Sequence, residues 1–406
     1  MIDLRAARAD PEGYRAALGR KGAAEAFDEL LEADARWREL VPQVDELRGR
    51  QKLKGKPTPE QAEELKRVKE ELRRLEEELS AAAAQRDELL QKVPNPPHDS
   101  VPDDVTEDAE GEVVRTAGDP PRLAEPRDHL QLARFDMERG ARLSGSRFGY
   151  IVGDAARLTL ALYRWALERV SAQGFVPVIP PVLVREEAMY GTGFFPAERF
   201  EIYEVAEEGL YLTGTSEVAL AGLHMGEILE ADELPLRYSG FSTNFRREAG
   251  AAGRDTRGMF RVHQFNKVEM FSFVRPTESW DEHERLLAIE ESLAHELGLP
   301  YRVVNIAVGE LSAAAAKRYD IEAWFPSQQR YRELTSASNT TDYQARRLGI
   351  RYRANGGTEY VHTLNGTAVT DRWALAVLEN FQDEEGNVAV PTVLTEFGAP
   401  PRLEPG

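Results

Sequence analysis

The chain of 406 residues contains no cysteine, so it can form neither a disulfide nor a thiolate metal site. Its seven histidines are scattered and form no H-E-x-x-H pattern, so the sequence does not predict a protein-bound zinc ion. No apolar run approaches the roughly 20 residues that a membrane-spanning helix needs, and the charged N-terminus lacks the apolar segment of a signal peptide. These absences predict a soluble cytoplasmic protein that does not bind a membrane.

Two common phosphate-binding patterns are also missing, because neither G-x-x-x-x-G-K-[ST] nor G-x-G-x-x-G occurs in the chain. Basic residues are outnumbered by acidic ones, 51 against 70, so the formal net charge is -19. Screening limits exposed charges to a distance of roughly 8 Å at physiological salt, so a local basic patch can still bind nucleic acid. The distribution of charge is therefore more informative than its sum.

The first hundred residues carry two heptad patterns separated by a short break rich in glycine and proline. Apolar residues recur at intervals of three and four, first over residues 30–47 and again over residues 65–89. Thr58 and Pro59 suit the start of the second helix, because threonine caps a helix and proline fits its first turn. We predict an antiparallel two-helix coiled coil at about residues 27–92, within a domain of residues 1–100, followed by a linker at 101–121 and a second domain at 122–406.

Basic residues are concentrated at the break between the two predicted helices. Five of them alternate along the chain with no acidic residue between them: Arg48, Arg50, Lys52, Lys54 and Lys56. Uncompensated like charges repel one another, so such a run predicts contact with a nucleic-acid backbone. The alternative is a solvated coiled-coil face, which we favour for the shaft of the hairpin, where acidic residues intersperse.

The second domain alternates helices with short apolar strands joined by hairpin-like loops, and it lacks a regular β-α-β order. This pattern favours an α+β fold, in which an antiparallel sheet is flanked by helices. An apolar helix at residues 158–173 precedes Gly174 and a strand at 176–184 that prolines interrupt. Proline is tolerated at the edge of a sheet, so we predict an edge strand there.

Residues 211–269 are the most informative stretch. Arg246 and Glu248 end one apolar strand, a loop rich in glycine and arginine follows, and a second apolar strand ends in Glu269. The planar guanidinium of arginine binds phosphate or carboxylate through two parallel hydrogen bonds. A carboxylate on the neighbouring strand can receive an ammonium or hydroxyl group. We predict a site that holds a nucleoside triphosphate beside a small zwitterion; the alternative is a polar hairpin with surface arginines.

Three other segments carry groups of matching chemistry. Residues 213–217 (TGTSE) form a small polar turn that suits a small ligand, although a helix-capping turn explains the same residues. Glu333 and Ser336 offer a carboxylate and a hydroxyl to a hard cation, and Mg²⁺ prefers oxygen ligands. Arg372 begins a predicted helix, where its charge opposes the helix dipole, and this favours a functional role over a surface salt bridge.

Together these segments resemble the class II aminoacyl-tRNA synthetases. Their amino-acid sequences are similar to those of the bacterial-type seryl-tRNA synthetases. Residues 211–269 resemble motif 2, residues 362–381 resemble motif 3, and the helix–strand unit at 158–184 resembles motif 1. The resemblance extends to the arm and the linker. The loop before Arg372 is one residue shorter than in many members of the family.

The resemblance implies a role for each residue of these motifs. Catalysis would use Arg246 and Arg372, and Mg²⁺ would bind Glu333 and Ser336. Serine would be bound by Thr215, Ser216, Glu217, Arg246, Glu269, Asn365 and Thr367. ATP would be bound, with Phe265 stacked on adenine, by Arg246, Arg247, Glu248, Val262, Phe265, Glu333, Leu334, Thr335, Ser336 and Arg372.

The family's reaction forms seryl-adenylate from L-serine and Mg-ATP and transfers serine to the 3′ end of tRNA(Ser), or of tRNA(Sec) where that tRNA exists. The resemblance further implies that the arm binds tRNA and that motif 1 joins a homodimer. One rival interpretation is a serine-activating ligase with a non-tRNA acceptor, which the basic arm disfavours. Another is a coiled-coil interaction protein with an inactive catalytic domain, which the retained motif arginines and acids disfavour.

Overall fold

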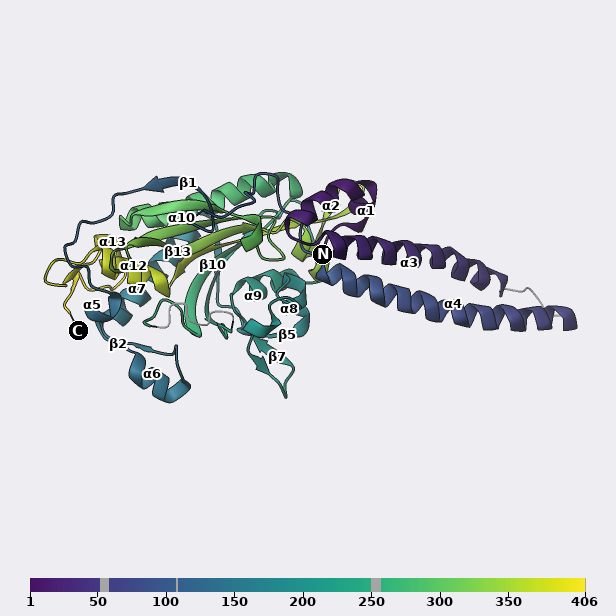
Figure 1. The fold of residues 1–406 in the computed structure, drawn as a ribbon, viewed down its shortest axis with the longest axis horizontal. Coiled ribbons are helices and arrows are strands. Elements are labelled where there is room, and N and C mark those ends of the chain that lie inside the picture. Colours follow the sequence, from purple (N-terminus) through teal and green to yellow (C-terminus); the bar gives the residue numbers. More distant parts are fainter. Residues whose placement is uncertain (52–57, 107–108, 250–256, 406) are drawn as a thin grey trace. The chain divides into compact units, whose positions relative to one another are not determined.

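The computed structural model describes residues 1–51, 58–106, 109–249 and 257–405. The chain separates into two compact units, Met1–Pro97 and His98–Gly406 (Figure 1). No helix of the described residues is long and apolar enough to cross a lipid bilayer.

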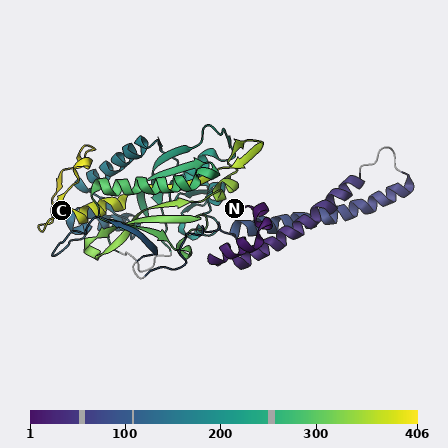
Figure 2. The ribbon, with the colours of Figure 1, turned by 90° about the horizontal axis from the view of Figure 1, so that it is seen from above.

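The described part of the first unit is helical. Helices α1 (Leu4–Ala9) and α2 (Pro11–Arg20) precede two long helices, α3 (Ala24–Arg50) and α4 (Pro59–Lys92). The two long helices meet along an apolar seam that includes Leu40, Val44, Leu47, Val68, Leu72 and Leu75. Thr58 caps α4 through a reciprocal pair of hydrogen bonds with Gln61, and Pro59 stands in the first turn. The predicted helical hairpin is confirmed, and Figures 1 and 2 show its helices side by side.

An eight-stranded sheet organises the second unit. Its strands follow the order β1 (Gly111–Ala117), β11 (Tyr301–Ile306), β12 (Lys317–Phe325), β13 (Arg330–Asn339), β16 (His362–Thr370), β10 (Gln264–Val274), β9 (Leu236–Phe245) and β4 (Val176–Val178). Neighbouring strands are antiparallel except at one edge, where β4 pairs with β9 in parallel. The predicted α+β fold is therefore confirmed, with one parallel edge strand that the sequence did not indicate.

Three long helices bury the main apolar core against this sheet: α7 (Asp154–Ala172), α10 (Ser279–Leu297) and α12 (Asp371–Asn380). In Figure 2 the green helix α10 runs along the strands. Trp165, Leu286 and Trp373 from these helices share one apolar cluster with Met270 of β10. Successive side chains of a strand point to opposite faces. Glu269, the neighbour of Met270, therefore points to the other face of the sheet.

Shorter elements complete the second unit. The remaining helices are α5 (His129–Leu132), α6 (Met137–Ser144), α8 (Glu186–Thr192), α9 (Glu217–Ala221), α11 (Tyr343–Leu348) and α13 (Thr392–Thr395). The remaining strands are β2 (Phe135–Asp136), β3 (Tyr150–Ile151), β5 (Leu183–Arg185), β6 (Glu204–Val205), β7 (Leu210–Leu212), β8 (Ile228–Leu229), β14 (Arg351–Ala354), β15 (Gly357–Tyr360), β17 (Val388–Ala389) and β18 (Arg402–Leu403).

The strand with proline lies at the edge of the sheet, as predicted. Strand β4 carries Pro177 and has a hydrogen-bonded neighbour on one side among the described strands. Apolar side chains on this strand and directly after it face solvent, since Val176 of β4 is 56% exposed and Ile179 is 87% exposed. An exposed apolar edge of this kind is typical of an interaction surface.

Candidate active site

Two adjoining cavities share a wall on the face of the sheet to which Glu269 points. One, of about 100 Å³, is lined in part by Phe260, Val262 and Phe265, and we name it the aromatic cavity. The other, of about 330 Å³, is lined in part by Thr215, Glu217 and Glu269, and we name it the polar cavity. Both cavities are lined by the same five side chains: Arg246, Glu248, Arg261, Lys267 and Ser336.

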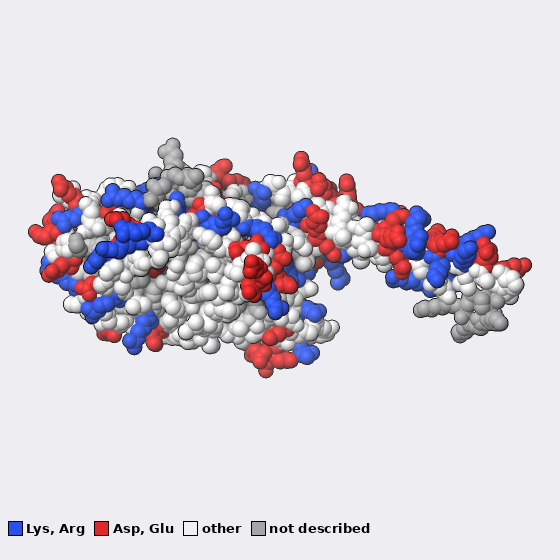
Figure 3. Space-filling view, turned by 90° about the horizontal axis from the view of Figure 1, so that it is seen from below, with Lys and Arg blue, Asp and Glu red and all other residues white. Residues whose placement is uncertain are grey.

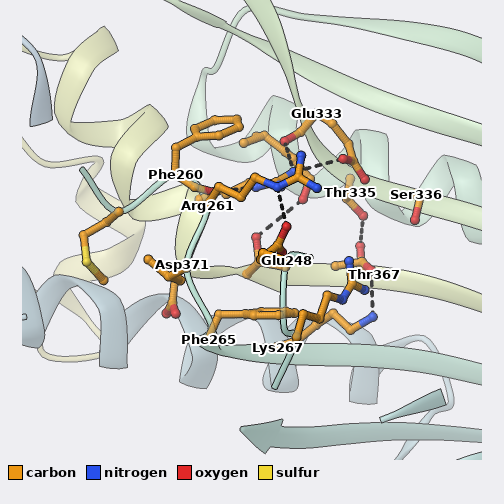
Figure 4. A pocket seen from close by; sticks show the side chains of 16 residues that line it. Glu248, Phe260, Arg261, Phe265, Lys267, Glu333, Thr335, Ser336, Thr367 and Asp371 are labelled. Atoms are coloured by element: carbon orange, nitrogen blue, oxygen red, sulfur yellow. Dashed lines mark hydrogen bonds and ion pairs between the residues drawn. The ribbon is translucent and has the colours of Figure 1, made fainter. Parts of the chain in front are cut away.

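Aromatic rings and guanidinium groups face one another in the aromatic cavity (Figure 4). The guanidinium of Arg246 lies 5.3 Å from the ring centre of Phe265 on β10, and that of Arg372 lies 4.6 Å from the ring centre of Phe260. Arginine attracts both aromatic faces and phosphate oxygens. The cavity therefore offers a flat apolar surface for a base, with positive charge close by for phosphates.

Arg372 is held at the start of α12 by a neighbouring carboxylate. Its Nη1 lies 2.9 Å from Oε2 of Glu333 on β13. Burial opposes the ionisation of Glu333, but the charges of Arg372 and Arg318 outweigh it and lower the pKa of this carboxyl to about 2. Glu333 is therefore ionised at neutral pH, with Arg372 as its partner.

A bulge in β13 brings Glu333 and Ser336 to the same cavity. Residues three apart on a regular strand point to opposite faces. Here Glu322 pairs with Glu333 and Ile321 pairs with Thr335, so Leu334 is left out of the ladder. This extra residue restores a common face, and both Glu333 and Ser336 line the aromatic cavity.

The wall formed by residues 258–260 is fastened to α12 at two points. Nε of Arg372 donates to the carbonyl oxygen of Phe260 at 3.2 Å. Further along α12, the buried Glu379 contacts Nδ1 of His129 at 3.1 Å, and Nε2 of His129 accepts from the backbone N–H of Met259 at 3.2 Å. The same helix therefore positions Arg372 and the wall that Arg372 touches.

A buried ion pair marks the floor of the polar cavity. Glu269 is 1% exposed, and its Oε2 lies 2.5 Å from Nζ of Lys267 on the same strand. The hydroxyl of Thr367 donates to the same carboxylate oxygen at 3.1 Å. Thr367 pairs with Glu269 across the ladder because Ala368 bulges out. Despite the shorter loop before Arg372, Thr367 thus lies directly beside Glu269.

Glu217 adds a second carboxyl to the polar cavity. It begins α9, as expected for a capping turn, and its Oε1 accepts a hydrogen bond from Nε2 of Gln344 at 2.7 Å. Burial, and to a smaller extent the nearby charge of Glu269, raises the pKa of Glu217 from 4.5 to about 7. The cavity therefore holds one carboxyl that titrates near neutral pH beside another that is paired with lysine.

The structure brings together most of the predicted site residues. Thr215, Glu217, Glu269 and Asn365 line the polar cavity, and Val262, Phe265, Leu334, Thr335, Thr367 and Arg372 line the aromatic cavity. Two predicted residues lie elsewhere: Ser216 is buried without lining either cavity, and Arg247 is exposed outside both. The expectation that these two side chains contact ligand is not supported by their placement.

Several residues of the site were missed by reasoning from the sequence. Lys267 and Arg261 line both cavities, and Glu198 and Arg318 line the polar one. For Lys267 a signal was present, because a residue two positions before Glu269 on a strand shares its face. Arg318 lies on β12, far from the motifs in sequence, and its position depends on the order of the strands.

The arm requires a correction. Arg48 and Arg50 were expected to be uncompensated, but Nη2 of Arg48 lies 2.8 Å from Glu76 and Nη2 of Arg50 lies 2.7 Å from Glu64. These two acidic partners come from α4, on the opposite side of the hairpin, so no pattern along one helix reveals them; Arg48 also lies 3.6 Å from Asp45 on its own helix. Figure 3 shows acidic and basic side chains interspersed along the arm. Lys52, Lys54 and Lys56 lie outside the described residues.

Comparison with known proteins identifies the family. The chain is 47% identical over 420 residues to the serine–tRNA ligase of Thermobifida fusca, covering 100% of this chain and 99% of that protein. The serine–tRNA ligase of Nocardia farcinica is 46% identical, with 100% of both chains covered. The chain belongs to the seryl-tRNA synthetase family. Two family models agree, since the seryl-tRNA synthetase N-terminal domain matches residues 1–97 and the tRNA synthetase class II core domain (G, H, P, S and T) matches residues 199–381.

Solved structures of this family have the same fold. The seryl-tRNA synthetase from Pyrococcus horikoshii, complexed with ATP, superimposes with a TM-score of 0.93 at 40% identity, covering 100% of both chains. The cytoplasmic serine–tRNA ligase of Naegleria fowleri, in complex with AMP, has a TM-score of 0.88 at 33% identity and covers 98% of this chain. The predicted family, fold and enzyme class are confirmed, and the chain is a class II serine–tRNA ligase.

Proposed function

We propose that this enzyme activates L-serine with ATP, giving seryl-adenylate and pyrophosphate, and then transfers serine to the terminal ribose of tRNA(Ser), or of tRNA(Sec) where that tRNA exists. The observation that carries the proposal is the pair of adjoining cavities. A polar cavity with buried carboxyls suits a small zwitterion, and an aromatic cavity with cations suits a nucleotide. Their shared wall contains Arg246, which therefore can reach the two groups that react.

The polar cavity is assigned to serine. Glu269 would receive the ammonium group. Asn365 would contact the side-chain hydroxyl together with Thr367, which lines the adjoining aromatic cavity and donates to Glu269. Thr215 and Glu217 complete the wall, and Arg246 would hold the carboxylate with a bidentate pair of hydrogen bonds. A cavity that hydrogen-bonds a hydroxyl discriminates strongly against alanine, because alanine leaves its buried polar groups unpaired.

The aromatic cavity is assigned to ATP. Adenine would stack on Phe265 beside Val262, and Arg372 would contact the terminal phosphates. Glu248 shares an ion pair with Arg261 in the wall, which fixes both side chains next to the phosphates. Leu334 and Thr335 would contribute the β13 side of the cavity. Arg247 is still proposed to contact ATP, and Ser216 is still proposed to contact serine. Because neither side chain lines a cavity, each would have to move to do so.

A magnesium ion fits the donor set of this cavity. Glu333 stays ionised, since its pKa is lowered to about 2, and Ser336 adds a hydroxyl oxygen from the same face. Mg²⁺ typically binds one or two carboxylates together with substrate phosphates and water. We assign Glu333 and Ser336 as its protein ligands; when bound, the ion would neutralise developing negative charge on the phosphates. Among the described residues no group of three His, Cys, Asp or Glu side chains forms a separate metal cage.

The reaction needs no protein nucleophile. The carboxylate of serine would attack the α-phosphorus, and the ribose hydroxyl of tRNA would then attack the acyl carbon. Arg246 and Arg372 are the proposed catalytic residues, since fixed guanidinium groups can orient the reactants and stabilise the charge of the transition state. Their positions are set by the strand end after β9 and by the start of α12.

Pyrophosphate exchange with a panel of amino acids tests the activation step. We expect serine-dependent exchange, with alanine, glycine and threonine far weaker at equal concentration. Better exchange with any other amino acid would overturn the assignment of serine.

Residues 1–100, with the arm, are the proposed tRNA-binding domain, and residues 122–406 are the proposed catalytic domain. The segment predicted as a linker, 101–121, contains β1, which pairs with β11 in the sheet of the second unit. Support comes from the match of residues 1–97 to the seryl-tRNA synthetase N-terminal domain. Arg48, Arg50, Lys52, Lys54 and Lys56 stay candidates for backbone contacts; the first two would exchange their acidic partners for phosphates. Replacing residues 43–74 by a short turn should spare pyrophosphate exchange and abolish tRNA charging, whereas normal charging would contradict the assignment.

The edge strand β4 is the proposed centre of a homodimer. Leu160 of α7, Val176 and Ile179 are exposed apolar residues, and burial of such surface stabilises an association. Ile179→Asp should shift the sedimentation coefficient from that of a dimer to that of a monomer, and a monomeric natural enzyme would refute the proposal. The cytoplasmic location stays a prediction from the composition and the N-terminal sequence.

A further inference from the structure

Lys267 occupies an unusual position in the polar cavity. Its side chain is 8% exposed, and its ammonium lies 2.5 Å from a carboxylate oxygen of Glu269 and 3.4 Å from the hydroxyl of Thr367. These are the two groups assigned above to serine. The protein therefore places an ammonium of its own against the carboxylate that is proposed to bind the ammonium of the substrate.

A buried carboxylate requires a counter-charge. Taking an ion out of water costs several kcal/mol unless a partner compensates, and removing one member of a buried pair leaves the other uncompensated. Glu269 is 1% exposed, and no guanidinium or second ammonium bonds to it among the described residues. Lys267 is therefore the counter-charge of Glu269 when no amino acid is bound.

A zwitterion is the one class of ligand that can open this pair without loss of charge balance. It brings one positive and one negative group, so each member of the Lys267–Glu269 pair can gain a new partner when the pair separates. Lys267 lines both cavities, so its ammonium can reach the wall that Arg246 also forms, where the substrate carboxylate is assigned.

We propose that Lys267 is a resident counter-ion of Glu269 that exchanges partners when the amino acid binds. The ammonium of serine replaces Lys267 at Glu269, and the ammonium of Lys267 moves to the carboxylate of serine. One buried ion pair becomes two, and the zwitterion adds no net charge to the cavity. The inference rests on the assignment of the polar cavity to serine and adds a residue that recognises both the charge and the zwitterionic form of the substrate.

The exchange predicts a penalty against ligands that lack one of the two charges. Serinol has the ammonium and hydroxyl of serine, but a hydroxymethyl group in place of the carboxylate. If serinol displaced Lys267, this buried lysine would be left without a counter-charge. Arg246 would lose less interaction energy than Lys267 when serinol replaces serine, because Arg246 is exposed and water can still hydrate its guanidinium. Lys267 is therefore the residue that makes serine bind better than serinol.

The test measures the dissociation constants of serine and serinol by calorimetry for the full-length enzyme and for Lys267→Met. We expect the preference for serine over serinol to fall at least about tenfold in the variant, since close charge pairs couple by more than 1.4 kcal/mol. Serine should also raise the melting temperature of Lys267→Met more than that of the natural enzyme, because its ammonium supplies the missing partner of Glu269.

The test has one control variant and one substitute variant. Lys317→Met removes another lysine of the second unit that is 8% exposed, hydrogen-bonded to Ser100 and outside both cavities. It should leave the preference unchanged. Lys267→Gln, which keeps a donor without the charge, replaces Lys267→Met if the latter does not fold.

An unchanged preference in the Lys267 variant that folds, or an equal loss in Lys317→Met, overturns the inference. If the natural enzyme binds neither ligand, the assignment of the cavity to serine fails instead.

Discussion

The titration of Glu217 should control how strongly the enzyme binds serine near neutral pH. Burial raises the pKa of this carboxyl to about 7, so it is mostly neutral at pH 6 and mostly ionised at pH 8. An ionised Glu217 in the polar cavity attracts the ammonium of serine, whereas a neutral one does not. The KM for serine should therefore fall as the pH rises through this range.

The size of the expected change in KM follows from the attraction between the Glu217 carboxylate and the ammonium of serine. Two unit charges about 6 Å apart at an effective dielectric constant of about 20 attract by about 3 kcal/mol, equivalent to a pKa decrease of about 2 units. Linkage then gives a KM that is about tenfold lower at pH 8 than at pH 6. This decrease belongs to Glu217 alone if the Glu217→Gln variant, which can still accept from Gln344, lacks it.

The assay is serine-dependent pyrophosphate exchange between pH 6 and pH 8, with ATP saturating. Glu217→Gln should have a flat KM profile. Glu310→Gln, which changes an exposed acid outside both cavities, should keep the natural profile. The comparison between variants is needed because Asp320 and Asp371 also have pKa values raised to about 7 by burial. A flat KM for the natural enzyme, or a natural profile in Glu217→Gln, would refute the reasoning.

Three further outcomes are expected. Because burial raises the pKa of Asp371 from 3.8 to about 7, the natural enzyme should lose up to about 4 kcal/mol of stability as the pH rises through this range. Asp371→Asn should remove this loss. The check is the free energy of unfolding in urea at pH 5 and at pH 8. If the difference in this free energy between the natural enzyme and the variant is the same at both pH values, the prediction is wrong. His129→Gln keeps an acceptor for the N–H of Met259 and should retain the natural KM for ATP. The asparagine side chain of His129→Asn is too short to accept this hydrogen bond, so that variant should have a higher KM for ATP. Equal KM values in the two variants would exclude a positioning role for His129. Glu269→Ala should abolish serine-dependent exchange, and exchange at the natural rate would remove Glu269 from the serine site.

The sequence by itself determined the parts of this protein whose signals are local and periodic. Heptad spacing places the apolar seam of α3 and α4, and the capping pair Thr58–Gln61 fixes where α4 begins. The motif residues Arg246, Glu269 and Arg372 were found because the sequences around them resemble the motifs of one family. For these residues the neighbours in sequence contain enough information, and the comparisons confirm the family to which they point.

The tertiary structure decided which of these groups meet, because that depends on strand order and on single-residue bulges. A bulge at Leu334 puts Glu333 and Ser336 on one face, and a bulge at Ala368 puts Thr367 beside Glu269. The same holds for charge: Glu64 and Glu76 compensate the arm arginines from the opposite helix. Spacing along the chain carries no information on pairing between strands or across a hairpin, and for this reason Arg318 was recognised as part of the site only once β12 was placed in the sheet.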